Sequence, residues 1–487
     1  MGNKKSAETA LTTKMADNIG AIKQYSAGSS DVLYKSAEAA GFPATIVLFE
    51  GMFSDSALSD YILTPLNHLK KIDEYTPDKL FAVLTESLFI SASGTVIDTV
   101  EDVYYYAASG CAVILIDGIG KAYACGVQGF KTRGIEQPTT SLNIRSSRES
   151  FTEVLRTNIT LLRRRYKSPG LVFDTTTVGT ATQTDVCVCY IKGKADDEIV
   201  RDIKRRIAEI PLETVLESGY IQPYLEESGN MIFSQCGITE RPDCIIGKLF
   251  CGRIAVIVDG TPFVLYLPKL FNENFQTMDD YAGSPVYISF MRILKCAAYI
   301  LAVLLPGFYI ALANFNPELF PPSLLFNLTA SVKSTPYPLM PECILINIMY
   351  EIMREAGLRL PKYIGHAVSI VGGLVIGQIA VSAGLVGAPL VLIVAMTGIA
   401  SFVVPDLYDN IVVLRFSFIF AGGFWGLYGL YILGIVVLVK MCSMTNFGVP
   451  YTTPVTPFRA RGMRDVFWRV PWPALAKGKA SPEITKE

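Results

Sequence analysis

Histidine is nearly absent from this chain, and its scarcity limits the chemistry that the chain can perform. Only two histidines, His68 and His366, occur among 487 residues, which leaves little room for a histidine-based active site. The sequence also lacks a zinc-binding helix motif and a nucleophile elbow. The Gly-Ile-Gly-Lys run after Asp117 lacks the spacing and the Ser/Thr of a phosphate loop, and a hairpin turn explains it. We therefore expect no enzyme activity and no cofactor.

An excess of charge of either sign is lacking too. The chain has 43 Lys and Arg against 44 Asp and Glu, and this balance argues against nucleic-acid binding. The densest basic run, Arg163 to Arg165, ends a predicted amphipathic helix whose apolar face carries Phe151, Leu155, Asn158, Ile159 and Leu162. A solvated or partner-facing helix end explains these arginines better than a site for an anionic lipid or nucleic acid.

The ten cysteines are not spaced as metal ligands. Cys187 and Cys189 are two positions apart in a predicted buried strand, so both point to one face of a sheet. Zinc sites usually draw paired cysteines from turns, with a wider and repeated spacing. We therefore expect structural thiols in a reducing compartment and no metal ion.

The beginning of the chain lacks the apolar core of a secretory signal peptide. Residues 1–30 are polar and are expected to form a flexible tail. The charged part of the chain that follows is then expected to stay in the cytoplasm.

Two motifs recur at one offset within this charged part. TIVLFEGMFSDSALSDYI and CVCYIKGKADDEIVRDIK each indicate a strand, a glycine turn and a helix, with Gly51 and Gly193 142 positions apart. AVILIDGIGKAYAC and IAVIVDGTPFVLYL each indicate a hairpin, with Asp117 and Asp259 again 142 apart. Both aspartates are interpreted as turn residues. The common offset predicts two related, tandem α/β subdomains, 31–144 and 145–284, with chance similarity of apolar strands as the alternative.

Long uncharged runs are concentrated after residue 285. A membrane-spanning helix needs about 20 apolar residues, and the uncharged runs cover 296–317, 363–405 and 416–439. Because the middle run is long enough for two short spans, we expect an α-helical transmembrane domain of about four to five spans over 285–440. A broken or re-entrant element at 341–357 or at Gly422-Gly423 stays open. The basic tail, 441–487, and the cations before the first span place both ends on the cytoplasmic side.

The run from Ala367 to Gly387 has two distinct helical faces. One face carries small residues that let another helix approach closely, namely Ser369, Gly373, Gly377, Ala380 and Gly384. The opposite face carries Val368, Val371, Val375, Gln378 and Ser382. This second face is a candidate pore lining with a hydrophobic gate, because an amide in hydrocarbon needs water or a partner. A hydrogen bond from Gln378 to a neighbouring helix is the alternative.

A mixed helix over 341–357 carries candidate pore-mouth carboxylates. Glu342, Glu351 and Glu355 could concentrate cations there. Surface charge paired with Arg354 and Arg359 explains them equally well.

Nine segments, in order along the chain, resemble the A subunit of GerA-type spore germination receptors. They are FEGMFSDSALSDYILTPL, SRESFTEVLRTNITLLRRR, TDVCVCYIKGKAD, LESGYI, TERPD, GRIAVIVDGTPFVLYLP, PECILINIMYEIMREAGLRLP, SIVGGLVIGQIAVSAGLV and TNFGVPYTTPVTP. The resemblance runs from about residue 32 to residue 473. One departure is RSSRES, where the family usually has Arg-Gly-Pro-Arg-Glu, which makes that turn less tight.

The resemblance implies a role in spore germination. It implies a multi-pass protein of the spore inner membrane that works with a transporter-like, nutrient-binding B subunit and a C-subunit lipoprotein. It also implies a homo-oligomer, for which a pentamer is one stoichiometry, around a nutrient-gated cation channel. Two alternatives stay open, a non-conducting signalling scaffold and a secondary transporter, and the membrane half shows no internal repeat of the kind that transporters have.

Overall fold

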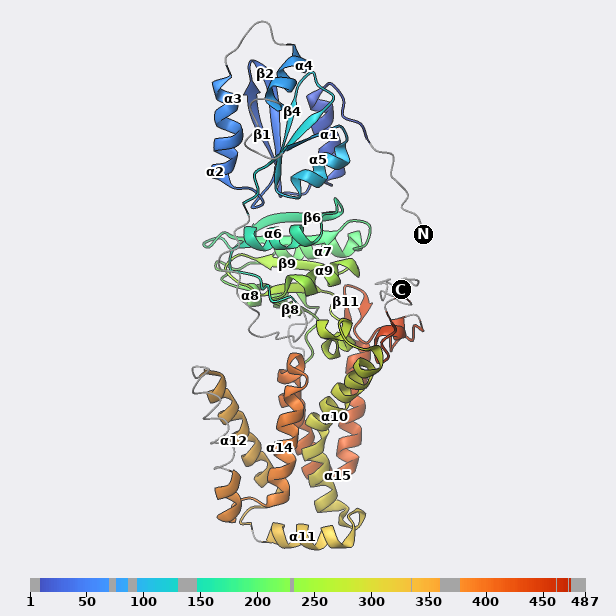
Figure 1. Ribbon diagram of the computed structural model, residues 1–487. Coiled ribbons are helices and arrows are strands. Elements are labelled where there is room, and N and C mark those ends of the chain that lie inside the picture. Colours follow the sequence, from blue (N-terminus) through green and yellow to red (C-terminus); the bar gives the residue numbers. More distant parts are fainter. Residues whose placement is uncertain are drawn as a thin grey trace. The chain divides into compact units, whose positions relative to one another are not determined.

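The computed structural model describes residues 9–69, 76–85, 94–129, 147–227, 232–333, 335–359, 377–460, 462–471 and 473. The chain divides into two compact units (Figure 1). The α/β unit takes in the chain up to Gly229 and the stretch Gln235–Lys269, and the helical unit takes in Asn230–Ser234 and Leu270–Pro482. The expected boundary at residues 284 and 285 therefore lies too late, because the short 3-10 helices after Leu270 pack with the helical unit.

The first half of the α/β unit is an antiparallel sheet between two helical layers. Its strand order is β1-β2-β4-β5-β3, with bounds β1 Val32–Ala39, β2 Phe42–Phe49, β3 Gly94–Ile97, β4 Cys111–Ile116 and β5 Ala122–Gly126. The helical segments are α1 Met15–Tyr25, α2 Asp55–Leu58, η1 Ser59–Leu63, α3 Thr64–His68, α4 Pro77–Val83 and α5 Val100–Ala107. Alternate strand residues face opposite layers. Ile46 and Ile114 pack with α2, η1, α3 and α4, whereas Val47 and Val113 pack with α1 and α5.

The second half of the α/β unit repeats this topology. Its strand order is β6-β7-β9-β10-β8, with bounds β6 Leu171–Val178, β7 Thr184–Ile191, β8 Gly237–Thr239, β9 Ile254–Val258 and β10 Val264–Leu267. Its helices are α6 Leu155–Arg165, α7 Asp197–Ala208, α8 Ser218–Leu225 and α9 Pro242–Phe250. Cys187 and Cys189 lie in one buried cluster, as expected for one face of β7. Burial raises the pKa of the Cys187 thiol to about 12, which keeps it protonated and unreactive.

Matching hydrogen bonds support the predicted duplication. Asp117 Oδ1 accepts from the Met15 amide at 3.0 Å, and Asp259 Oδ1 accepts from the Leu155 amide at 2.8 Å. Each aspartate thus satisfies a backbone donor at the start of a helix, a group that has no partner within the helix itself. Asn18 and Asn158 likewise bond the backbone six residues earlier.

The expectation that residues 1–30 form a flexible tail is wrong for its second half. Met15–Tyr25 is helix α1, the counterpart of α6, and its Ile22 side chain is fully buried. The polar composition hid this helix, because only one narrow stripe of it faces the sheet. The first α/β subdomain consequently begins before residue 31.

A buried arginine joins the two α/β subdomains. Arg163, in the last turn of α6, donates from Nε and Nη2 to the two carboxylate oxygens of Asp31 at 2.9 and 3.0 Å. Its Nη1 donates to the Tyr104 hydroxyl at 2.6 Å, and its plane lies near the rings of Phe49 and Phe173. Burial acts to lower the pKa of the guanidinium, and the Asp31 carboxylate outweighs it, so the pKa is raised. The sequence predicts that Arg163 lies at a solvated or partner-facing helix end. In the structure Arg163 instead faces the first α/β subdomain of its own chain.

The helical unit contains five described helices of twelve residues or more. They are α10 Pro285–Phe315, α11 Pro322–Lys333, α12 Leu339–Arg359, α14 Ala388–Phe402 and α15 Tyr408–Ser443. The short elements are η3 Phe271–Phe275, η4 Met278–Tyr281, η5 Pro317–Leu319, η6 Pro405–Leu407, β11 Thr445–Asn446, β12 Val449–Pro450 and η7 Gly462–Asp465. Within the described residues, two stretches are long and apolar enough to cross a membrane, Pro285–Phe315 and Pro405–Ser443. The expected four to five spans are therefore not confirmed.

Glycines let α10 and α15 touch and let α15 reverse. A Cβ on Gly307 would come within 2.4 Å of the Phe418 carbonyl oxygen, and one on Gly422 within 2.4 Å of the Gly307 oxygen. Gly426 interrupts α15 with φ of +61°, a left-handed value that favours glycine. A Cβ on Gly429 would then meet the Ala421 oxygen at 2.4 Å, so α15 folds back on itself. The expected broken element near Gly422-Gly423 lies at Gly426.

Replacing Arg163 by Met should loosen the contact between the two α/β subdomains. The substitution leaves the Asp31 carboxylate buried and unpaired, which costs about 3–5 kcal/mol. We expect faster hydrogen exchange, measured by mass spectrometry on the full-length protein, at the Ser30 and Phe173 amides, which bond across this contact at 3.0 Å.

Arg156→Met is the matched control on the same helix. Its ion pair with Glu50 is largely exposed, so the loss should stay below about 1 kcal/mol. Equal exchange rates in the two variants would show that the buried pair does not hold the subdomains together.

Candidate functional site in the helical unit

The ion pair of a fully buried arginine joins three helices of the helical unit. The Arg415 side chain, on α15, has no exposed surface, and its Nη1 lies 3.4 Å from Glu351 Oε1 on α12. Its Nε donates to the Ala302 carbonyl of α10 at 3.0 Å. Because a buried charge is costly without a partner, this arginine fixes the approach of α10, α12 and α15.

Glu351 is shared among several donors. Its Oε2 accepts from the Tyr408 hydroxyl at 2.7 Å and from Arg354 Nε at 3.1 Å. Arg354 lies one helical turn after Glu351, and its guanidinium stacks on the Tyr408 ring at 3.8 Å from the centroid. One carboxylate therefore serves two arginines, and Arg354 Nη2 also lies 3.9 Å from Glu355 Oε2.

Among the described residues, two polar atoms of fully buried side chains in this region have no hydrogen-bond partner. They are Arg415 Nη2, a donor, and Asn347 Oδ1, an acceptor one turn before Glu351 on α12. Both side chains are fully buried. Polar side chains thus follow one another along α12, between helices whose other contacts are mostly apolar.

An open groove lies beside this cluster, with a volume of about 510 Å³. Apolar side chains form much of its wall, and charged side chains form the rest; together they are Ile348, Ile352, Val412 and Phe416 with Glu351, Arg354 and Glu355. The groove therefore presents both charged and apolar side chains on the surface of a single chain.

The three predicted pore-mouth carboxylates have different surroundings. Glu351 and Glu355 pair with Arg354, and Glu355 also pairs with Arg359 at 2.6 Å, as the surface-charge alternative expects. Glu342 is buried, and its Oε1 accepts from the Gly387 amide at 2.6 Å. Glu342 faces the turn that precedes α14 because it lies on the inner side of α12. A pore-mouth role for these residues stays a prediction.

The predicted pore helix is only partly described. Val368, Val371 and Val375, and with them Ser369 and Gly373, lie outside the described residues. At the described end, Gln378 and Ser382 are exposed and Ala380 is buried. A Cβ on Gly377 would lie 3.6 Å from Val391 of α14, and Gly384 has φ of +66° in the turn before that helix.

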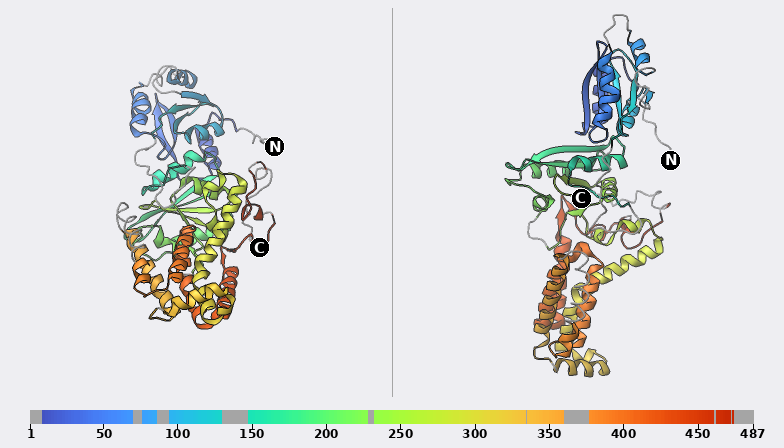
Figure 2. Two further views of the ribbon diagram at one scale, coloured as in Figure 1. Left: turned by 60° about the horizontal axis from the view of Figure 1, so that its bottom comes forward. Right: turned by 60° about the vertical axis from the view of Figure 1, so that its left-hand side comes forward.

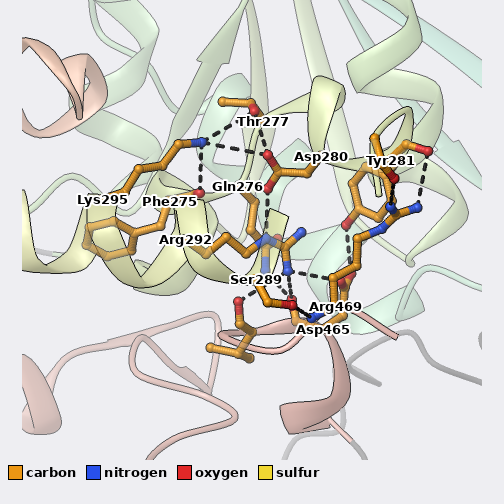
Figure 3. Close-up of polar contacts among 12 residues, drawn as sticks. Phe275, Gln276, Thr277, Asp280, Tyr281, Ser289, Arg292, Lys295, Asp465 and Arg469 are labelled. Carbon is orange, nitrogen blue, oxygen red and sulfur yellow. Dashed lines mark hydrogen bonds and ion pairs between the residues drawn. The ribbon is translucent and has the colours of Figure 1, made fainter. Parts of the chain in front are cut away.

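A second polar cluster ties the end of the chain to the start of α10 (Figure 3). Arg292 is fully buried; its Nε donates to Asp280 at 2.7 Å and its Nη1 to Asp465 at 3.0 Å. Asp465 also accepts from the Tyr281 hydroxyl at 2.7 Å. Burial raises the pKa of that phenol, and the Asp465 carboxylate raises it further, so Tyr281 stays a donor. Arg469 donates to the Gly283 and Tyr281 carbonyls at 2.7 and 3.1 Å.

Neither cluster was predicted from the sequence. A signal for Arg415 was present, because a single cation between two uncharged runs needs a partner in a membrane helix. The sequence could not identify the partner of Arg415, because Glu351 lies 64 positions away along the chain. Asp465 and Arg469 were assigned to a basic tail, where only the packing reveals their partners.

Removing the Glu351 carboxylate alone should destabilise the helical unit more than removing both partners of the Arg415–Glu351 pair. Glu351→Gln leaves the fully buried Arg415 cation without its carboxylate, which costs about 3–5 kcal/mol. Arg415→Met leaves Glu351 with Arg354 and the Tyr408 hydroxyl, so its loss should be smaller. We expect a clear fall in the thermal midpoint of the detergent-solubilised protein for Glu351→Gln and partial recovery in the double variant.

Arg359→Met serves as the control, because its pair with Glu355 is exposed. Its midpoint should stay near that of the unmodified chain. A double variant whose loss equals the sum of the two single losses would show that the pair carries no coupling.

Comparisons with known proteins identify the family. The family model described as Bacillus/Clostridium GerA spore germination protein matches residues 20–480. Spore germination protein KA of Bacillus subtilis (strain 168) is 36% identical over 483 residues, which cover 98% of this chain and 88% of that protein. The uncharacterized membrane protein YfkQ of the same strain is 36% identical over 469 residues, 95% of this chain and 90% of that protein.

Among solved structures, the crystal structure of the N-terminal domain of the A subunit of the Bacillus megaterium spore germinant receptor GerK3 is similar. It is 30% identical, covers 54% of this chain and 98% of its own, and has a TM-score of 0.45. The family model and the two Bacillus subtilis relatives confirm the resemblance drawn from the nine sequence segments. The chain therefore belongs to the GerA family of spore germination proteins.

Proposed function

We propose that this chain is the A subunit of a nutrient-sensing spore germination receptor and that its copies assemble around a nutrient-gated cation channel. The membership of the GerA family supports the receptor role. One structural observation supports the assembly. Gln378 and Ser382 are exposed on a single chain, while Ala380 and Gly377 of the same short helix pack against their own chain.

This exposure has a consequence if the helix lies in a bilayer. A primary amide facing hydrocarbon is costly, so Gln378 needs either another copy of the chain or water beside it. A ring of copies around a central pore supplies both. The valine face that we predict from Val368 to Val375 then forms the hydrophobic gate of that pore, which closes by excluding water.

The proposed mechanism is a shift between two arrangements of the assembly. A transporter-like B subunit binds the nutrient, a C-subunit lipoprotein completes the receptor, and nutrient binding favours the open arrangement because it is tighter there. In the open arrangement the valine face parts and fills with water. Monovalent cations then leave the spore.

We place the protein in the spore inner membrane with both termini on the core side. The cations near the start of α10 and the basic residues after α15 support this orientation, because short cytoplasmic segments are enriched in Lys and Arg. In this placement the α/β unit lies in the spore core, where reduced thiols such as Cys187 and Cys189 persist.

Val371→Ser and Val375→Ser should open the gate without nutrient. Hydroxyl groups on the valine face favour water in the constriction. We expect constitutive potassium leak from cells that express the variant chain with its cognate partners, measured by flame photometry. Val436→Ser, a matched change on an exposed apolar position of α15, should not leak.

Two results would count against the channel. Unchanged leak in both gate variants, with the nutrient response and the assembly preserved, would favour the non-conducting scaffold. An equal potassium leak in the Val436→Ser control would show that any polar substitution in the membrane helices makes the membrane leaky.

A further inference from the structure

The first three turns of α10 leave an apolar face uncovered. Val286, Tyr287 and Phe290 are 78%, 60% and 62% exposed, and Ile293 and Leu294 are about half exposed. These positions fall on one side of a helix. A continuous stripe of this kind on the surface of a protein marks a contact with a partner or a membrane.

The opposite face of the same three turns is closed by polar contacts. Arg292 is held by Asp280 and Asp465, and Lys295 lies 3.7 Å from Asp280. Ser289 Oγ accepts from the Arg469 amide at 2.9 Å. Figure 3 shows these groups meeting on one side of the helix. The segment is thus amphipathic, with its polar side already occupied by its own chain and only its apolar side free.

The length of α10 places these turns at the edge of a bilayer. The helix has 31 residues, so it is about 46 Å long. The hydrocarbon core is about 30 Å thick, which about 20 residues cross. About eleven residues therefore exceed the core, and the excess matches Pro285–Lys295 if the other end of α10 lies at the far boundary.

An aromatic cluster marks that far boundary. The end of α10 lies where α15 reverses, because a Cβ on Gly426 would come within 2.9 Å of the Phe315 ring. Around this reversal the exposed side chains are Phe424, Trp425, Tyr428 and Tyr431. Trp and Tyr gather at the two interfaces of a membrane, so Phe315 is at the boundary opposite Pro285.

We propose that Pro285–Lys295, together with the tail residues Phe467 and Trp468, forms an interfacial anchor on the bilayer. Its apolar face enters the headgroup and upper acyl region of the core-side leaflet. The right-hand view of Figure 2 agrees, because the beginning of α10 leans away from the orange helices. Trp468 is 65% exposed, and it precedes Arg469, whose backbone lies against Ser289.

The charge of this surface favours anionic headgroups. Arg464, in η7 beside Asp465, and Lys440, in the last turn of α15, are exposed. Juxtamembrane cations of this kind are attracted to acidic lipids. The anchor rests on the proposed membrane placement of α10, and it does not depend on conduction. The anchor would link the tail around Trp468 to the start of α10 and hold both at the same depth in the bilayer.

Depth-dependent quenching of a single tryptophan tests the anchor. In the full-length protein, Trp425, Trp468 and Trp472 are changed to Phe, and Phe290→Trp is added as the reporter. The protein is reconstituted into phosphatidylglycerol-containing bilayers whose lipids carry bromine high on the acyl chains. We expect strong loss of Trp emission, because bromine quenches only rings that it touches.

Two further single-tryptophan proteins serve as controls. Native Trp425 alone reports whether the helical unit is inserted, and it should be quenched. Phe250→Trp, a similarly exposed aromatic position of α9 in the α/β unit, should keep its emission.

The outcomes separate the anchor from the membrane placement. If Trp425 is quenched and the Phe290→Trp reporter is not, the anchor is wrong and the membrane placement of the helical unit still holds. The same conclusion follows if the emission of the Phe290→Trp reporter changes with the protein-to-lipid ratio, because that dependence indicates contact between two copies of the chain. No quenching at either position would overturn both.

Discussion

The buried guanidinium group is the constraint on which the packing of both units depends. Arg163, Arg292 and Arg415 are each fully buried, and each pairs with a carboxylate from a distant part of the chain. Because a buried guanidinium without its carboxylate is an uncompensated charge, these pairs specify which elements meet more sharply than apolar contacts do. Asp31 ties the two α/β subdomains, Asp465 ties the tail to α10, and Glu351 ties α12 to α15.

The same constraint bears on how the helical unit could change shape. Glu351 serves Arg415, Arg354 and Tyr408 at once, so a shift of α12 along α15 exchanges donors and does not leave the carboxylate bare. The neighbouring Arg415 Nη2 and Asn347 Oδ1 have no partners in the described part of the chain, so both can form hydrogen bonds in a second arrangement of these helices. Gly307 and Gly422 meanwhile keep α10 and α15 in backbone contact. Motion within the unit is therefore expected at α12 and not at the α10–α15 contact.

Periodicity and offset in the sequence were enough to predict the repeated α/β subdomains, and the resemblance of nine segments was enough to predict the family, because both depend on local patterns of many residues. Asp117 and Asp259 revealed the repeat, and the structure shows that each also holds the start of a helix. The first of those helices, α1, was missed, although Thr12 and Asn18 match Thr152 and Asn158. The ion pairs were missed for a different reason, since contacts between residues tens of positions apart leave no periodic trace. The valine face of the candidate pore remains a prediction from helical spacing, and the structure adds only its exposed end, Gln378 and Ser382.

Cysteine accessibility at that exposed end is the most direct test of a pore. Gln378→Cys would be introduced into a chain whose exposed Cys442 is changed to Ser, assembled with its cognate partners, and treated with a membrane-impermeant cationic thiol reagent. A water-filled, nutrient-gated pore predicts that the reagent modifies the new cysteine faster after nutrient is added and that modification reduces potassium release. Modification that is absent in both states, or that leaves potassium release unchanged, would contradict a pore along this helix.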